Sequence, residues 1–119
     1  MAGAEEMENS LNIVGAFGEA WGRHDLEATL ALITDDCLFN DTEPAPDGTR
    51  YQGREAIRKA WAPIFADINS RFEAEETFAL GDRVVQLWRY SWADGHVRGV
   101  DVFRVSDGKV SEKLSYVKG

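Results

Sequence analysis

Residues 88–103 read WRYSWADGHVRGVDVF, and this stretch decides the fold. The dipeptide Asp94-Gly95 readily adopts the positive φ angles of a tight turn, so the stretch predicts two antiparallel strands joined there as a hairpin. Side chains two residues apart in a strand project from the same face. One face of the first strand therefore carries three large aromatic side chains: Trp88, Tyr90 and Trp92.

The second strand of this hairpin places a carboxyl group on the same face. With Asp94 and Gly95 as a two-residue loop, the predicted pairs are Trp92 with Val97, Tyr90 with Gly99, and Trp88 with Asp101. Asp101 then lies among large rings, and Gly99 leaves space beside it. Burying a carboxyl group in a solid core is costly, so this pattern favours a pocket.

The rest of the chain predicts an α+β fold, with three N-terminal helices followed by an antiparallel sheet. After Asn69 the polarity alternates, and four strands are expected at about 70–80, 83–93, 96–106 and 109–118. Before it, helical spacing of apolar residues predicts a helix from about Ser10 to Gly22, a second helix capped by Asp25, and a third that begins near Arg54.

The connecting segments complete this prediction. The buried stripe of the second helix consists of Leu26, Thr29, Leu30 and Ile33. The inner side of the third helix carries Ile57, Trp61, Ile64 and Phe65. Residues 37–41 predict a short strand that ends in a turn rich in proline and glycine. We expect residues 1–8 to be a flexible tail and residues 9–119 to form a single domain.

Composition narrows the class of function. The chain has 119 residues and a net charge of −8, which disfavours binding to nucleic acids or anionic membranes. No apolar run is long enough to span a bilayer, and the acidic N-terminus is unlike a secretory signal. The one cysteine, Cys37, cannot form an internal disulfide, so we expect a cytoplasmic protein.

The opposite face of the two central strands mixes aliphatic side chains with arginines. Its residues are Val85, Leu87, Arg89, Ser91, Arg98, Val100, Val102 and Arg104. Such a mixture suits a partner subunit better than bulk water. We therefore expect a homodimer formed through this outer face of the sheet.

Three segments in order resemble the nuclear transport factor 2-like superfamily: HDLEATLALITDDCLFND, YQGREAIRKAW and VDVFRVSDGKVSEKLSYVKG. The resemblance covers nearly the whole chain and is strongest to the polyketide-cyclase-like and ketosteroid-isomerase-like branch. It implies three N-terminal helices packed on a strongly curved antiparallel sheet, which together form a cone-shaped pocket. Because this branch includes isomerases, cyclases, epoxide hydrolases and proteins without known activity, the fold alone does not define the function.

The resemblance to ketosteroid isomerases implies roles for two acids. Asp41 falls where those enzymes carry the general base, and Asp101 falls where they carry a protonated aspartic acid that donates to the oxyanion. Two positions depart from that pattern, because Phe17 replaces the oxyanion tyrosine and Trp61 replaces a supporting tyrosine. The arginine and the aspartates that limonene-epoxide hydrolases use are not matched in this chain. Ser115 occupies the position of their aspartate on the last strand.

Each acid also has a simpler interpretation. Asp41 is either a base at the pocket mouth or a strand-end acid that caps the following turn. Asp101 is either a buried acid that donates a proton or one half of an ion pair. Lys113 is the expected partner if the turn at residues 106–108 takes three residues and puts both side chains on one face.

The sequence therefore predicts a cofactor-independent pocket protein for a hydrophobic small molecule. We expect an enzyme of isomerase, cyclase or hydrolase type, with Asp41 and Asp101 as catalytic residues; the alternative is a non-catalytic binding module. The aromatic residues expected to line the pocket are Phe17, Trp21, Phe39, Trp61, Trp88, Tyr90, Trp92 and Phe103. His24 and His96 are expected in turns, and no metal-ligand spacing is present in the sequence.

Overall fold

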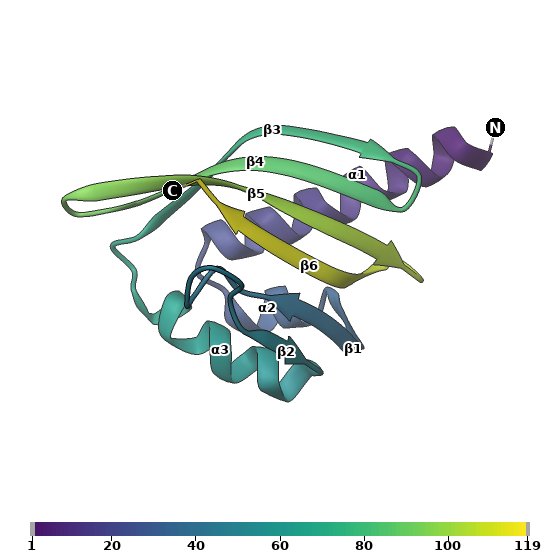
Figure 1. The fold of residues 1–119 in the computed structure, drawn as a ribbon. Coiled ribbons are helices and arrows are strands. Elements are labelled where there is room, and N and C mark those ends of the chain that lie inside the picture. The colour runs from purple at the N-terminus through teal and green to yellow at the C-terminus, as the bar shows by residue number, and fades with distance from the viewer. Residues whose placement is uncertain (1, 119) are drawn as a thin grey trace.

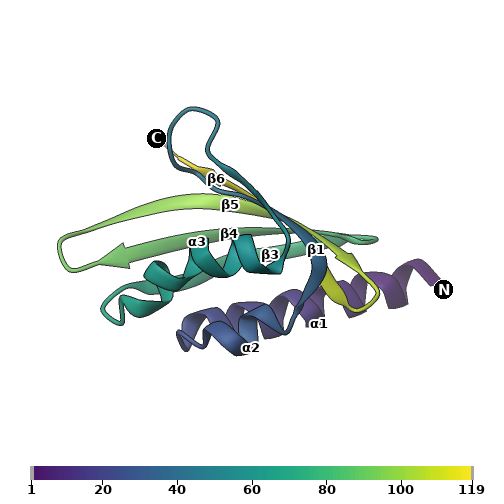
Figure 2. The same cartoon turned by 90° about the horizontal axis from the view of Figure 1, so that it is seen from below.

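The computed structural model describes residues 2–118 and shows an α+β fold, as the sequence predicts. The elements are α1 (Ala2–Gly22), α2 (Leu26–Leu30), β1 (Ile33–Asn40), β2 (Arg50–Gln52), α3 (Arg54–Ala66), β3 (Arg71–Leu80), β4 (Arg83–Trp92), β5 (Gly95–Ser106) and β6 (Lys109–Val117). Figure 2 shows the three helices on one side of the sheet, and the apolar core lies between them and the sheet.

The sheet is mixed rather than fully antiparallel. Its strand order is β2-β1-β6-β5-β4-β3. The predicted meander of β3 to β6 is antiparallel throughout, but β1 lies parallel to β6. The sequence shows the meander because short turns join its strands, whereas the β1–β6 pair joins segments that are far apart in the chain (Figure 1).

The first helix is longer than its apolar pattern predicts. It begins at Ala2 instead of near Ser10, so the part of the predicted tail that is described is helical; Met1 lies outside the described residues. Alanine, glutamate and methionine are strong helix formers, which explains a helix where the apolar spacing is absent. Figure 1 shows this end of α1 projecting beyond the sheet.

Helix α2 has the predicted N-cap but ends earlier than predicted. The carboxylate of Asp25 accepts a hydrogen bond from the backbone N–H of Ala28 at 3.0 Å, as expected for an N-cap. Ile33 is buried as expected, but it belongs to β1 and not to the helix. Strand β2 was not predicted, because three residues carry too little alternation to be recognised.

The β4–β5 hairpin keeps the predicted faces but not the predicted register. Trp92 pairs with Gly95, Tyr90 with Val97, and Trp88 with Gly99, so Ala93 and Asp94 form the turn. The register differs from the prediction by two residues, and an even shift leaves every side chain on its face. The inner face therefore carries Val84, Gln86, Trp88, Tyr90, Trp92, Val97, Asp101 and Phe103, and the outer face carries the eight residues predicted for it.

A β-bulge in β6 decides the orientation of Lys113. The turn from β5 to β6 takes two residues, Asp107 and Gly108, both with positive φ. Val105 pairs with Val110 and Arg104 with Glu112, which leaves Ser111 as an extra residue. Because one extra residue reverses the faces of all that follow, Lys113 projects from the inner face. The three-residue turn considered from the sequence is wrong, but the shared face is correct.

Candidate functional site

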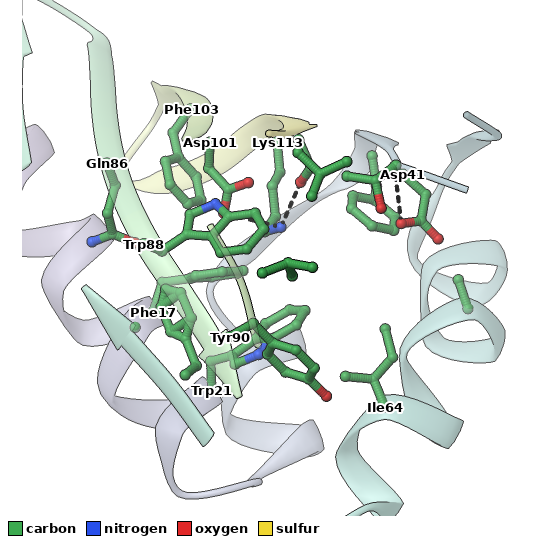
Figure 3. Close-up of a pocket in the computed structure, with 18 of the residues that line it drawn as sticks. Phe17, Trp21, Asp41, Ile64, Gln86, Trp88, Tyr90, Asp101, Phe103 and Lys113 are labelled. Atoms are coloured by element: carbon green, nitrogen blue, oxygen red, sulfur yellow. Dashed lines mark hydrogen bonds and ion pairs between the residues drawn. The ribbon is translucent and has the colours of Figure 1, made fainter. Parts of the chain in front are cut away.

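A cavity of about 370 Å³ lies between the inner face of the sheet and the helices α1 and α3 (Figure 3). Its wall is mainly aromatic, and these rings are Phe17, Trp21, Phe39, Phe72, Trp88, Tyr90 and Phe103. Ala60 and Ile64 of α3 line the cavity too. A space of this size with apolar walls is suited to a small hydrophobic molecule.

Two of the predicted lining residues lie elsewhere. Trp61 is fully buried in the core, with its ring centroid 5.7 Å from that of Phe17 and 5.4 Å from that of Phe39. It therefore supports two rings of the wall from behind. Trp92 is 41% exposed near the hairpin turn and does not line the cavity. The sequence could not distinguish these positions, because both follow the same apolar pattern as the lining residues.

The position of Trp88 depends on the glycine that faces it. A Cβ atom at Gly99 would overlap Cζ2 of Trp88 and the backbone carbonyl oxygen of Tyr116. The absence of a side chain there lets the indole of Trp88 approach the backbone of β5 closely. Gly99 was predicted to leave open space next to Asp101, but the ring of Trp88 fills that space.

Asp101 and Lys113 form a buried ion pair at one end of the cavity. Lys113 Nζ lies 3.2 Å from Asp101 Oδ2, and both residues are at least nine-tenths buried. Figure 3 shows the two side chains next to each other, on one side of Phe103. Among residues 2–118, no group donates a hydrogen bond to the second carboxylate oxygen, Asp101 Oδ1. The pair therefore leaves one buried acceptor unsatisfied.

The ammonium group of Lys113 has further partners. It donates a hydrogen bond to the hydroxyl oxygen of Ser115 at 2.9 Å. It also lies 4.9 Å from the ring centroids of both Trp21 and Phe39. Such rings attract a cation through their negative faces. These contacts hold the lysine in place at one end of a mainly apolar cavity.

This arrangement changes the interpretation of Asp101. The ion pair is the alternative that the sequence left open, and a carboxylate that holds an ammonium has no proton to give to a ligand. The same region contains Phe17 where a tyrosine hydroxyl would be needed for an oxyanion. At this end of the cavity, the side chains that can donate are therefore Lys113 and Ser115.

Asp41 follows the end of β1 and lines the opposite part of the cavity (Figure 3). Its Oδ1 accepts a hydrogen bond from the backbone N–H of Thr42 at 2.7 Å, so it stabilises the turn as the simpler interpretation expects. Its partial exposure and its place in the cavity wall also fit the interpretation as a base. The structure is compatible with both roles.

Several lining residues were not predicted. They include Gly18, Thr42, Glu43, Phe72, Gln86, Val97, Ser115 and Val117. Gln86 pairs with Asp101 across the strands, and its Nε2 donates a hydrogen bond to Thr77 Oγ1 at 3.2 Å. Its place two residues before Trp88 on the same strand is a signal that could have identified it.

The remaining reactive side chains lie outside the cavity. Burial raises the pKa of the Cys37 thiol to about 12, so this cysteine is a core residue and not a nucleophile. His24 lies 3.4 Å from the Ser70 hydroxyl, and His96 is exposed. Across residues 2–118, His, Cys, Asp and Glu form no cluster of three or more that could hold a metal. None of the helices in that range is both long and apolar enough to span a membrane.

The model of the SnoaL-like domain matches residues 14–113. This chain belongs to the SnoaL-like domain family. The fold is similar to that of a nuclear transport factor 2-like protein of unknown function from Mesorhizobium loti, with 43% identity, a TM-score of 0.88 and coverage of 96% of this chain and 94% of that one. This confirms the superfamily that the sequence resembles.

More distant solved structures show the fold alone. A putative ketosteroid isomerase from Kribbella flavida is 16% identical, with a TM-score of 0.82 over 96% of this chain and 81% of that one. A putative polyketide cyclase from Sinorhizobium meliloti is 21% identical, with a TM-score of 0.76 over 88% and 94%. The SnoaL-like family thus shares its architecture with both branches of the predicted resemblance.

A curated relative contains a similar segment within a much longer protein. The α,α-trehalose-phosphate synthase of Yarrowia lipolytica is 29% identical over 110 residues, which is 92% of this chain. The chain spans 19% of the length of that relative. The similarity therefore concerns one segment of the synthase.

Proposed function

We propose that this SnoaL-like protein binds a hydrophobic small molecule in its aromatic cavity without a cofactor. The observation that carries the proposal is the open space of about 370 Å³, with rings on its walls and a buried ion pair at one end. A pocket that served only as core would be filled by side chains. Polar groups converging at one end of an apolar cavity are typical of ligand sites.

We further propose that Asp41 acts on the bound molecule as a proton acceptor, in a reaction of isomerase, cyclase or hydrolase type. Asp41, directly after β1, and Lys113, in β6, line the same cavity. A base at one side and a cation at the other suit proton abstraction next to a carbonyl group. Because Asp101 is ion-paired, its proposed role changes from proton donor to anchor for Lys113.

Exchange of carbon-bound protons tests the catalytic proposal. In heavy water, the protein should accelerate the uptake of deuterium at the carbon atoms next to the carbonyl group of 2-tetralone. Proton NMR measures this uptake as the loss of the corresponding proton signals. Asp41→Asn should slow this exchange by roughly 10²- to 10⁴-fold while 2-tetralone still binds. Asp36→Asn is the matched control, since Asp36 is an exposed acid on β1, the strand that precedes Asp41.

The outcome separates the two candidate functions. Equal exchange by wild type and Asp41→Asn would remove the assignment of the base. Binding of 2-tetralone without any exchange above the buffer rate would favour the alternative, a non-catalytic binding module. The ion-paired state of Asp101 and the phenylalanine at position 17 are the observations that support this alternative.

Pairing of two copies through the outer face is also proposed. This side of the sheet exposes Phe78 and Leu80 of β3 and Tyr116 of β6, at 49%, 81% and 56%. Large exposed apolar side chains on one face are typical of association surfaces. Sedimentation equilibrium should give twice the chain mass, and a stable monomer would contradict this proposal.

A further inference from the structure

Strand β6 presents two neighbouring hydrogen-bond donors to the cavity. The bulge at Ser111 turns Lys113 and Ser115 to the inner face, where both line the cavity and each is 7% exposed. They are two residues apart on one strand, so their side chains project side by side. Figure 3 shows the side chain of Lys113 extending from β6 toward the lining rings. A ligand in the cavity can therefore meet both groups at once.

The ammonium group of Lys113 has one donor more than the protein uses. It carries three N–H groups. Ser115 Oγ accepts from one of them at 2.9 Å, and Asp101 Oδ2 faces a second at 3.2 Å. Within residues 2–118 the third N–H has no oxygen acceptor, although the rings of Trp21 and Phe39 attract the charge from 4.9 Å.

The hydroxyl group of Ser115 also has a donor left over. Because its oxygen accepts from Lys113, its own proton points away from the ammonium group. No hydrogen bond within the described part of the chain uses this proton. Buried donors that lack partners are costly, so both groups favour a ligand that supplies an acceptor.

This end of the cavity offers a ligand no acceptor in return. Asp101 Oδ2 is taken by Lys113, and Asp101 Oδ1 is buried away from any accessible surface. A carbonyl oxygen fits such a set of donors, because it only accepts and has two lone pairs. A hydroxyl group would bring a proton that finds no partner here.

The charges of the cavity favour an uncharged ligand. Within residues 2–118 the charged lining residues are Asp41, Glu43, Asp101 and Lys113. Asp101 already neutralises Lys113, so a carboxylate ligand would be buried without a countercharge of its own. Asp41 and Glu43 would repel it as well.

We propose that the cavity selects an uncharged carbonyl compound and binds its oxygen with both Lys113 and Ser115. This inference rests on the proposed binding function and adds the class of ligand and the residues that recognise it. The resemblance to ketosteroid isomerases places the donors at positions 17 and 101, where this chain has a phenylalanine and an ion-paired aspartate. The bulge in β6 supplies the donors instead, and Asp101 positions Lys113.

Carbon NMR of 2-tetralone labelled with ¹³C at its carbonyl carbon tests the contact directly. Hydrogen bonds to a carbonyl oxygen draw electron density from its carbon, so the signal moves downfield as the bonds strengthen. Contact with an ammonium and a hydroxyl group should move the bound signal downfield of its position in water. A bound signal upfield of that position would overturn the proposal while leaving the binding function intact.

Calorimetric titration with three matched compounds tests the class of ligand: 2-tetralone, 2-tetralol and tetralin-2-carboxylate. They share one bicyclic body and differ in the polar group. Because 2-tetralol leaves its proton unpaired, 2-tetralone should bind about tenfold more tightly, and the carboxylate should bind most weakly. Equal or tighter binding of either competitor would overturn the proposed class. If none of the three compounds bound, both the class and the proposed binding function would be wrong.

Two variants test the residues. Ser115→Ala removes one donor, so it should weaken binding of 2-tetralone by roughly 3- to 10-fold and reduce the downfield displacement of its signal. Ser91→Ala makes the same change on the outer face of β4 and should alter neither. Asp101→Leu combined with Lys113→Met replaces the buried pair by apolar side chains and should also move the bound signal upfield of its wild-type position.

Circular dichroism confirms that each variant is folded. A bound signal that stayed in its wild-type position in both Ser115→Ala and the double variant would place the carbonyl group elsewhere in the cavity and overturn the assignment of the two donors.

Discussion

Strand β5 carries two ion pairs on opposite faces, and they differ in almost every respect. On the inner face, the side chains of Lys113 and Asp101 are 8% and 5% exposed. On the outer face, those of Arg98 and Glu75 are 51% and 40% exposed, with Arg98 Nε 3.0 Å from Glu75 Oε1. The outer pair stays partly hydrated, so its formation costs little desolvation. The inner pair loses almost all contact with water.

This difference indicates what each pair contributes. Exposed ion pairs stabilise a fold by about 0–1 kcal/mol, since water screens the charges. A buried pair costs so much desolvation that apolar replacements are often equally stable or better. The inner pair is therefore a poor means of stabilising the fold, and its place in the cavity wall fits the proposed binding function.

The largest expected effect is the loss of one partner from the inner pair. Lys113→Met leaves the carboxylate of Asp101 buried without a counterion, and we expect the free energy of unfolding to fall by about 3–5 kcal/mol. Urea denaturation followed by tryptophan fluorescence measures this change. The double variant Asp101→Leu with Lys113→Met should recover most of the loss. A single variant as stable as wild type would show that Asp101 is not held as a charged group.

A smaller loss is expected where Trp88 crosses β5. Gly99→Ala forces a methyl group against the indole and the Tyr116 carbonyl, and overpacking of this kind costs about 1–3 kcal/mol. Gly15→Ala is the matched control, because its Cβ atom would meet nothing within 4 Å on the exposed side of α1. That control should gain about 0.5–1 kcal/mol from higher helix propensity. Equal stability of the two variants would contradict the described position of Trp88.

The smallest effect belongs to the outer pair. Arg98→Gln should change the free energy of unfolding by at most about 1 kcal/mol, and the change should decrease with added salt. Denaturation at low and high sodium chloride concentration measures both features. A loss as large as that of Lys113→Met would mean that the outer face is also desolvated, as it would be within a stable dimer.

The sequence predicts most of the fold because alternation and turn residues are local signals. The four meander strands, the Asp25 cap and the start of α3 at Arg54 follow from them. Parallel pairing of β1 with β6 does not, since no local pattern joins distant segments. The β4–β5 register was predicted two residues out because Gly95, expected in the turn, instead makes room for the Trp92 ring.

The site was predicted less completely, for a related reason. Six of the eight predicted aromatic residues line the cavity, because helical spacing and strand alternation both assign side chains to a face. Neither pattern gives the depth of a side chain, so the buried Trp61 and the exposed Trp92 were included. Lys113 reaches the cavity through a bulge at Ser111, which has no recognisable sequence signal. Sequence reasoning could therefore pose the Asp101–Lys113 pair only as an alternative.

The central claim is that a small molecule binds beside the inner ion pair. The most direct test is the set of tryptophan indole signals in a ¹⁵N-correlated NMR spectrum during titration with 2-tetralone. Trp88 and Trp92 lie on one strand, but only Trp88 lines the cavity, so its Nε1–H signal should shift with saturation while that of Trp92 stays in place. A shift confined to Trp92, or no shift at Trp88 at saturating 2-tetralone, would contradict the account.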